Sequence, residues 1–247
     1  MPAFRTIAAR LLLCCICLTA TGAASPATRI YLDQVAPLAY GDNGDCKGLL
    51  CELMAEMARR ADRRVVMTPL PLIRLRVSLS NDRDGLGTLW RLPALEGDYK
   101  WWFKLLDARF YMVAAAGTRH DISSVAAARH LRVGVILGSP AELMARNAGF
   151  DNIQVSTSPE SIAKKLALGR IDVWIGTPRV LRAVYQRMGQ DQAPLRIGQE
   201  IMGLGLYLAS GHGFSPQEAQ RWHAALEAMK KDGSYAAILL KYPDSLQ

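Results

Sequence analysis

Short apolar runs alternate with helical stretches along this chain, and this alternation constrains the fold more than any other feature. The segment Thr28 to Val35 (TRIYLDQV) alternates as a strand does, and a helical pattern begins at Leu49, with apolar residues three and four positions apart. The segment RVVMTPL is then a second predicted strand. Strand, helix and strand in this order predict the start of a parallel sheet.

The same order begins again near residue 131. Leu131 to Leu137 is predicted to be a strand, Gly138-Ser139-Pro140 a turn, and a helix is predicted to begin near Ala141. NIQVS, PESIAKKLALGR and IDVWIG then predict a strand, a helix and a strand. The sequence contains no repeat, low-complexity stretch or long linker. The predicted fold class is therefore α/β, with two lobes joined by strands rather than by a flexible tether.

Four further segments complete the expected secondary structure. LIRLRVSLS fits a helix or a strand equally well, whereas IMGLGLYLAS and the second half of KWWFKLLDARFYMVAAA predict buried strands. The clearest helix signal comes last, with Ser215 as N-cap, Pro216 at the first position, Glu218 at the third and Gly233 as the stop.

Residues 1–24 have the composition of a secretory signal peptide. Arg5 and Arg10 precede a short apolar run, LLLCCICL, and TATGAAS supplies the small residues of a cleavage site after Ala24 or Ala23. The run is shorter than the roughly 20 residues that a membrane span needs. We therefore expect a soluble, exported protein.

Cysteine content and charge narrow the function further. Removal of the leader leaves Cys46 and Cys51, and two nearby cysteines in an oxidising compartment most simply form one disulfide. The formal net charge is +8, and a basic surface is either simply solvated or steers anionic ligands or an anionic membrane. An exported protein rarely meets nucleic acid, so we do not expect nucleic acid as a partner. The four histidines lack the spacing of metal ligands, so we expect no metal and no cofactor.

Two segments have the composition of anion-binding sites. Gly138-Ser139 stands between a strand and a helix, where backbone N–H groups and a hydroxyl can bind an anion, or the serine can be an ordinary helix cap. In DGLGTLWRLP, Gly87 and Thr88 with Arg91 can form a second site, because a guanidinium binds a carboxylate through two hydrogen bonds. The alternative is a solvated arginine on a loop.

Signatures of common enzyme classes are missing from the sequence. It has no G-x-S-x-G, H-E-x-x-H or Walker motif, and its G-x-G pairs lack the third glycine of a dinucleotide-binding fingerprint. Glu200 and Asp172 are candidates for acid–base chemistry, although such carboxylates are more often surface or capping residues. Trp174 can stack on a ligand, although aromatic residues at strand ends are more often part of the core.

In their order, these segments resemble the periplasmic solute-binding proteins of the family that includes the polar amino-acid-binding components of ABC importers. The resemblance lies in APLAYGDNGDCKGLLCEL, PLPLIRL, GTLWR, EGDYKWW, HLRVGVILGSP, LALGRIDVWIG and LEAMKKDGSYAAILLKY, and covers nearly all of the mature chain. It implies a monomeric periplasmic protein with the type II two-lobed fold and two crossover strands. Residues 28–113 and 206–247 would form lobe 1, and residues 114–205 lobe 2.

The resemblance also implies a ligand site between the lobes. In amino-acid-binding members, the arginine of Thr-x-x-Arg and a Gly-Ser/Thr turn of the other lobe clamp the α-carboxylate, roles that fall here to Arg91 and to Gly138-Ser139. The candidate ligand-binding residues are Tyr40, Arg74, Gly87, Thr88, Arg91, Gly138, Ser139, Trp174 and Thr177.

Two departures from the family pattern bear on the ligand. Thr177 stands about where amino-acid binders carry an acidic residue for the α-ammonium, and Trp90 replaces the acidic residue of Thr-x-Glu-Arg. We therefore expect a carboxylate-bearing or related small solute, presented to an importer permease or a membrane sensor. Two other functions stay open: an enzyme on the same fold, similar to cyclohexadienyl dehydratases, with Glu200 or another cleft acid transferring the proton, and an adaptor with a degenerate cleft.

Overall fold

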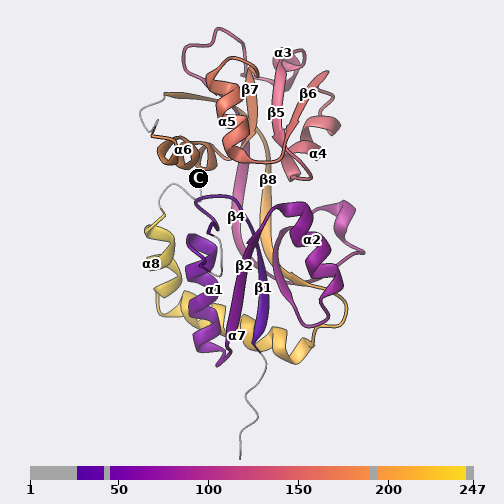
Figure 1. Cartoon of the computed structure of the whole chain (residues 1–247), viewed down its shortest axis with the longest axis vertical. Coiled ribbons are helices and arrows are strands. Elements are labelled where there is room, and N and C mark those ends of the chain that lie inside the picture. Colours follow the sequence, from indigo (N-terminus) through magenta and orange to yellow (C-terminus); the bar gives the residue numbers. More distant parts are fainter. Residues whose placement is uncertain (1–26, 42–44, 190–193, 243–247) are drawn as a thin grey trace, which may run out of the picture.

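A mixed β-sheet runs through the length of the molecule (Figure 1). The structure is a computed structural model that describes residues 27–41, 45–189 and 194–242 of the 247-residue chain. Within these ranges the sheet has eight strands in the order β2-β1-β3-β8-β4-β7-β5-β6. The strands are β1 (Thr28–Asp33), β2 (Val65–Leu70), β3 (Leu86–Trp90), β4 (Lys100–Ala115), β5 (Arg132–Ile136), β6 (Asn152–Ser156), β7 (Val173–Gly176) and β8 (Leu195–Ser210). The helices are α1 (Leu49–Arg60), α2 (Leu72–Asn81), α3 (Val125–Ala128), α4 (Pro140–Asn147), α5 (Pro159–Ala167), α6 (Pro178–Arg187), α7 (Pro216–Lys231) and α8 (Ser234–Leu240), with a short 3-10 helix at Pro93–Leu95.

The molecule has two lobes, and the long strands β4 and β8 run through both. In Figure 1 the lower lobe holds β1 to β3 with α1, α2, α7 and α8, and the upper lobe holds β5 to β7 with α3 to α6. β4 and β8 have 16 residues each and pair antiparallel along their whole length. This arrangement confirms the predicted α/β fold of two lobes joined by two crossover strands. The predicted lobe boundaries fall within or beside these strands and stay a prediction.

The ambiguous segment LIRLRVSLS forms helix α2. Leu72, Leu75 and Leu79 are its buried residues, and this spacing of three and four places them on one face of a helix. That face packs on Leu89 of β3, so the helix covers one side of the sheet in the lower lobe.

The helix ends agree with those predicted from the sequence, except for two differences. The hydroxyl of Ser215 accepts a hydrogen bond from the N–H of Glu218 at 3.4 Å, which confirms the predicted cap of α7. Gly233 has a left-handed backbone (φ 82°), so the C-terminal stretch forms two helices, α7 and α8. Helix α6 was not predicted, although Thr177 and Pro178 give it the same start signal as α7.

The predicted disulfide between Cys46 and Cys51 is confirmed, and it ties the loop before α1 to the first turn of that helix. The predicted leader lies outside the described residues. Within the described ranges, none of the helices has the length and apolar character needed to cross a membrane. The same ranges contain no cluster of three or more His, Cys, Asp or Glu residues that could hold a metal ion.

Candidate functional site

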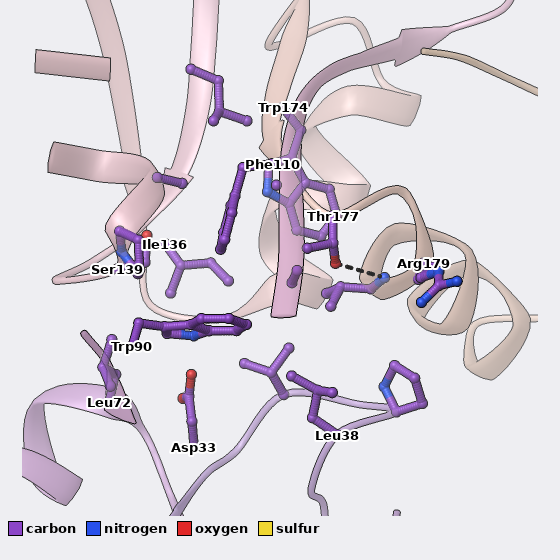
Figure 2. Close-up of a pocket in the computed structure, with 18 of the residues that line it drawn as sticks. Asp33, Leu38, Leu72, Trp90, Phe110, Ile136, Ser139, Trp174, Thr177 and Arg179 are labelled. Carbon is purple, nitrogen blue, oxygen red and sulfur yellow. Dashed lines mark hydrogen bonds between the residues drawn. The ribbon is translucent and has the colours of Figure 1, made fainter. Parts of the chain in front are cut away.

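A mostly apolar cleft lies between the two lobes, beside the point where β4 passes from one to the other (Figure 2). The empty space between the lining residues, counted together with the solvent at the open mouth, is ≈ 710 Å³. The lining residues are Asp33, Val35, Pro37, Leu38, Leu72, Trp90, Leu106, Ala108, Phe110, Ile136, Ser139, Pro140, Ala141, Trp174, Ile175, Gly176, Thr177, Arg179 and Val180. Both lobes and the crossover strand therefore contribute to one site.

Three aromatic side chains from three different strands form one wall of this cleft. Trp90 ends β3 and meets Phe110 of β4 edge to face, with ring centroids 5.4 Å apart. Trp174 of β7 is almost fully buried, and the absence of a side chain at Gly176 leaves room for its indole. The sequence indicated Trp174, but Phe110 was missed because its place depends on how far β4 extends.

The cleft also contains a buried carboxyl group, that of Asp33 at the end of β1. Only 8% of this residue is exposed, and its carboxyl makes no hydrogen bond to any residue the structure describes. Burial raises the pKa of Asp33 to about 7, and the positive charge of Arg76 on α2 opposes that rise. Figure 2 shows the carboxyl pointing toward Trp90. Sequence reasoning missed Asp33, although ligands often bind at the carboxyl ends of parallel strands, where β1 ends.

Two of the polar residues that lobe 2 brings to the cleft are helix caps. Ser139 caps α4 by accepting a hydrogen bond from the N–H of Glu142 at 3.3 Å, and Thr177 caps α6 by accepting one from Val180 at 3.4 Å. The carboxylate of Glu142 in turn accepts a hydrogen bond from the N–H of Gly138 at 2.7 Å. A carboxylate of the protein itself therefore takes the turn N–H that was expected to bind the ligand.

Arg91 is not among the residues that line the cleft, where the predicted clamp placed it. Its guanidinium donates two hydrogen bonds to Glu96, at 2.7 and 3.0 Å, and stacks over the rings of Trp101 and Tyr207. β3 continues through Trp90, and side chains alternate between the faces of a strand, so Trp90 faces the cleft and Arg91 the opposite side.

Six of the other predicted residues lie in three places. Ser139, Trp174 and Thr177 line the cleft, and their role in ligand binding stays a prediction. Gly87 and Thr88 are buried within β3, where a side chain at position 87 would collide with Leu79. Arg74 is exposed on α2 and is not among the lining residues.

A second, more polar pocket shares four residues with the apolar cleft and forms its outer part. The shared residues are Asp33, Val35, Leu72 and Ile136. Tyr40 lies in this outer pocket, where the guanidinium of Arg187 from the other lobe stands 5.2 Å from its ring centroid. Tyr40 therefore lines the outer pocket and not the apolar cleft, and its role in ligand binding stays a prediction.

The two acids considered for proton transfer lie outside both pockets. Glu200 forms an ion pair with Arg109 at 3.2 Å on the surface. Asp172 accepts hydrogen bonds from the backbone and the side chain of Arg132, and that guanidinium lowers the pKa of Asp172. Among the described acids, Asp33 is the one that lines the apolar cleft, so it is the candidate for an enzymatic role there.

Comparison with known proteins finds similarity in sequence and in fold. No family model matches the chain. In sequence the chain is 24% identical over 220 residues to the probable amino-acid-binding protein YxeM of Bacillus subtilis (strain 168), covering 85% of this chain and 80% of that protein.

Solved structures with the same fold have several functions in their names. A histidine kinase sensor domain with similarity to periplasmic binding proteins matches with a TM-score of 0.78 and 15% identity, over 87% of this chain and 95% of that chain. The ancestral amino acid-binding protein AncCDT-1, a precursor of cyclohexadienyl dehydratase, matches at 0.75 and 18%, over 87% and 95%. The substrate binding protein of an amino acid ABC transporter matches at 0.75 and 14%, over 88% and 99%.

Proposed function

We propose that this chain is a solute-binding protein, because it has the two-lobed periplasmic-binding-protein fold and is similar in sequence to an amino-acid-binding protein. Its lobes close on a small molecule, and the closed form is presented to a partner in the membrane. The observation that carries this proposal is the cleft itself, which is lined from both lobes and holds a buried acid among aromatic side chains.

Location and partner are parts of the same proposal. The composition of residues 1–24 and the disulfide support an exported, periplasmic protein. An importer permease and a membrane sensor both fit as partners, because solved structures of similar fold include a transporter component and a sensor domain.

The finer prediction was a carboxylate-bearing solute. Arg91 no longer supports it, since that side chain lies outside the cleft. A feature that could still bind a carboxylate is the pair of helix N-termini, capped by Ser139 and Thr177, that border the cleft. At the first of them, however, Glu142 already accepts the hydrogen bond of the Gly138 N–H.

A thermal-shift screen of amino acids, organic acids, opines and amines tests the proposal. A solute that binds the folded protein raises its melting temperature by mass action. The shift should be lost in Ala108→Leu, which fills the cleft, and kept in Ala116→Leu, a matched change at an exposed position at the end of β4. A shift that survives Ala108→Leu places the ligand elsewhere. No shift with any solute favours the adaptor.

A second function is favoured by one observation. The pKa of Asp33, raised to about 7 by burial, suits a general acid or base, and a precursor of cyclohexadienyl dehydratase has a similar fold. Turnover of a cyclohexadienyl acid that Asp33→Asn abolishes would establish an enzyme. Turnover that persists in this variant rules out Asp33 as the catalytic group.

A further inference from the structure

We propose that the cleft takes a small organic amine that has an apolar body and no carboxylate, with the ammonium group held by Asp33 and the body packed on Trp90 and Phe110. This inference rests on the proposed solute-binding function and names the class of solute. It follows from four properties of the described residues. One acid has no hydrogen-bond partner, aromatic side chains line the cleft beside it, the N–H of the Gly138-Ser139 turn is already bonded, and Arg91 lies outside the cleft.

The first property is the acid. Asp33 is more than nine-tenths buried, and its carboxyl points into the cleft without a hydrogen-bond donor from the described residues (Figure 2). A buried carboxylate without a partner is costly, and an ammonium group of the ligand would supply both the opposite charge and the missing donors. Arg76 on α2 acts on Asp33 only through its charge and makes no hydrogen bond to it.

The second property is the aromatic wall beside that acid. Trp90 lies directly above Asp33 in Figure 2, with Phe110 beyond it. Aromatic faces attract cations, and a cation–π contact is worth more in a desolvated site than at the surface. The wall also packs well against an apolar body, which the remaining lining residues, mostly aliphatic, would surround.

The third and fourth properties disfavour a carboxylate on the ligand. At the Gly138-Ser139 turn, a ligand carboxylate would compete with the Glu142 carboxylate that already accepts the Gly138 N–H at 2.7 Å. The arginine that would clamp a carboxylate from the other lobe, Arg91, is bonded to Glu96 outside the cleft. Arg179 also lines the cleft, on the far side of Thr177 from Asp33 (Figure 2).

Two matched trios of solutes separate the classes by isothermal titration calorimetry. Phenethylamine, phenylalanine and 3-phenylpropionate share one aromatic body, and isopentylamine, leucine and 4-methylpentanoate share one aliphatic body. We expect at least one amine to bind at least about tenfold more tightly than its amino acid and its acid, a difference of 1.4 kcal/mol. If neither amine binds, or if an acid or amino acid binds as tightly, the inference is wrong. Binding by an acid or amino acid would leave the solute-binding function intact.

A pair of variants tests whether Asp33 holds the ammonium group of the ligand. Asp33→Asn should weaken amine binding by at least about tenfold, whereas Asp98→Asn, the same change at an exposed position, should leave it unchanged. Equal affinity in both variants would overturn the role of Asp33.

The pH dependence of the wild type gives a test that needs no variant. Because the pKa of Asp33 is about 7, its ionised fraction rises about tenfold between pH 6 and pH 8, while an alkyl amine stays protonated. Amine affinity should therefore rise by about tenfold over this range. The other charged groups near Asp33 are Arg76 on α2, Arg179 on α6, and Glu160 and Arg187 at the outer pocket. An affinity that is flat or falls with pH contradicts the inference.

Discussion

Replacing Asp33 by Asn should stabilise the ligand-free protein at neutral and alkaline pH. The carboxyl is buried among apolar side chains and has no hydrogen-bond partner among the described residues, so its ionised form is disfavoured in the folded state. Asn has nearly the same shape and stays neutral. The substitution therefore removes an electrostatic cost without leaving a cavity.

The size of the effect follows from the shift in pKa. Burial raises the pKa of Asp33 from 3.8 to about 7. A raised carboxyl pKa means that the folded state holds the proton more tightly than the unfolded state does. The free energy of unfolding therefore falls as the pH rises from about 4 to about 7, by about 1.4 kcal/mol per pH unit, and then levels off. The total is about 4 kcal/mol, an upper limit because local rearrangement and water reduce it.

Urea unfolding followed by tryptophan fluorescence measures this directly. At pH 4 the wild type and Asp33→Asn should differ little, and by pH 8 the variant should be more stable by up to about 4 kcal/mol. Asp98→Asn, at an exposed position, should keep a constant difference from the wild type. A difference between Asp33→Asn and wild type that does not change with pH would refute the argument that Asp33 is buried and unpaired.

Three further predictions concern other parts of the molecule. Arg91→Ala should leave solute affinity within about twofold, because the side chain lies outside the cleft. Gly138→Ala should weaken solute binding and cost about 1 kcal/mol of stability, because φ is 69° and a Cβ there would lie 2.4 Å from Cδ1 of Ile73 in the other lobe. Replacing Cys46 and Cys51 together by Ser should cost roughly 2 kcal/mol, seen as a melting temperature several degrees lower, because the disulfide closes a short loop.

Calorimetry with a solute found in the thermal-shift screen measures the predicted changes in affinity. Thermal melts measure the predicted changes in stability. A large loss of affinity in Arg91→Ala would show that the arginine contributes to the ligand site. If the Ile73 contact limits closure, Ile73→Ala added to Gly138→Ala should restore part of the lost affinity; no recovery would assign the loss to the backbone alone. A melting temperature that the double Cys→Ser change does not lower would show that the loop is held by its other contacts.

Local signals in the sequence predicted most of the fold because each depends on a few neighbouring residues. The start of α7 at Ser215-Pro216 and the burial of Leu72, Leu75 and Leu79 on one face of α2 are of this kind. Helix α6 carried the same start signal and was simply not recognised. The through-running β4 was predicted only in its second half, since nothing local shows that one strand serves two lobes.

The site was harder to predict because side-chain direction depends on register. The spacing Thr-x-x-Arg does not reveal whether the strand ends before Thr88 or continues through Trp90, and one residue of difference reverses the face of Arg91. Asp33 was predictable in principle, as the residue that ends a parallel strand. The absence of a hydrogen-bond partner for its carboxyl was not predictable, because it depends on the side chains that α2 and β3 place around Asp33.

The continuation of β3 through Trp90 links these observations. It puts an indole where the carboxylate-binding arginine was expected, and it sends Arg91 to the outer face, where Glu96, Trp101 and Tyr207 hold it. On the other lobe the Gly138-Ser139 turn is bonded by Glu142, another carboxylate of the protein. Both halves of the expected clamp are thus satisfied within the protein, while the carboxyl of Asp33 is not. A group that is buried and unsatisfied in the free protein has the most to gain from a ligand, so the charge of the solute should be read from Asp33 rather than from Arg91.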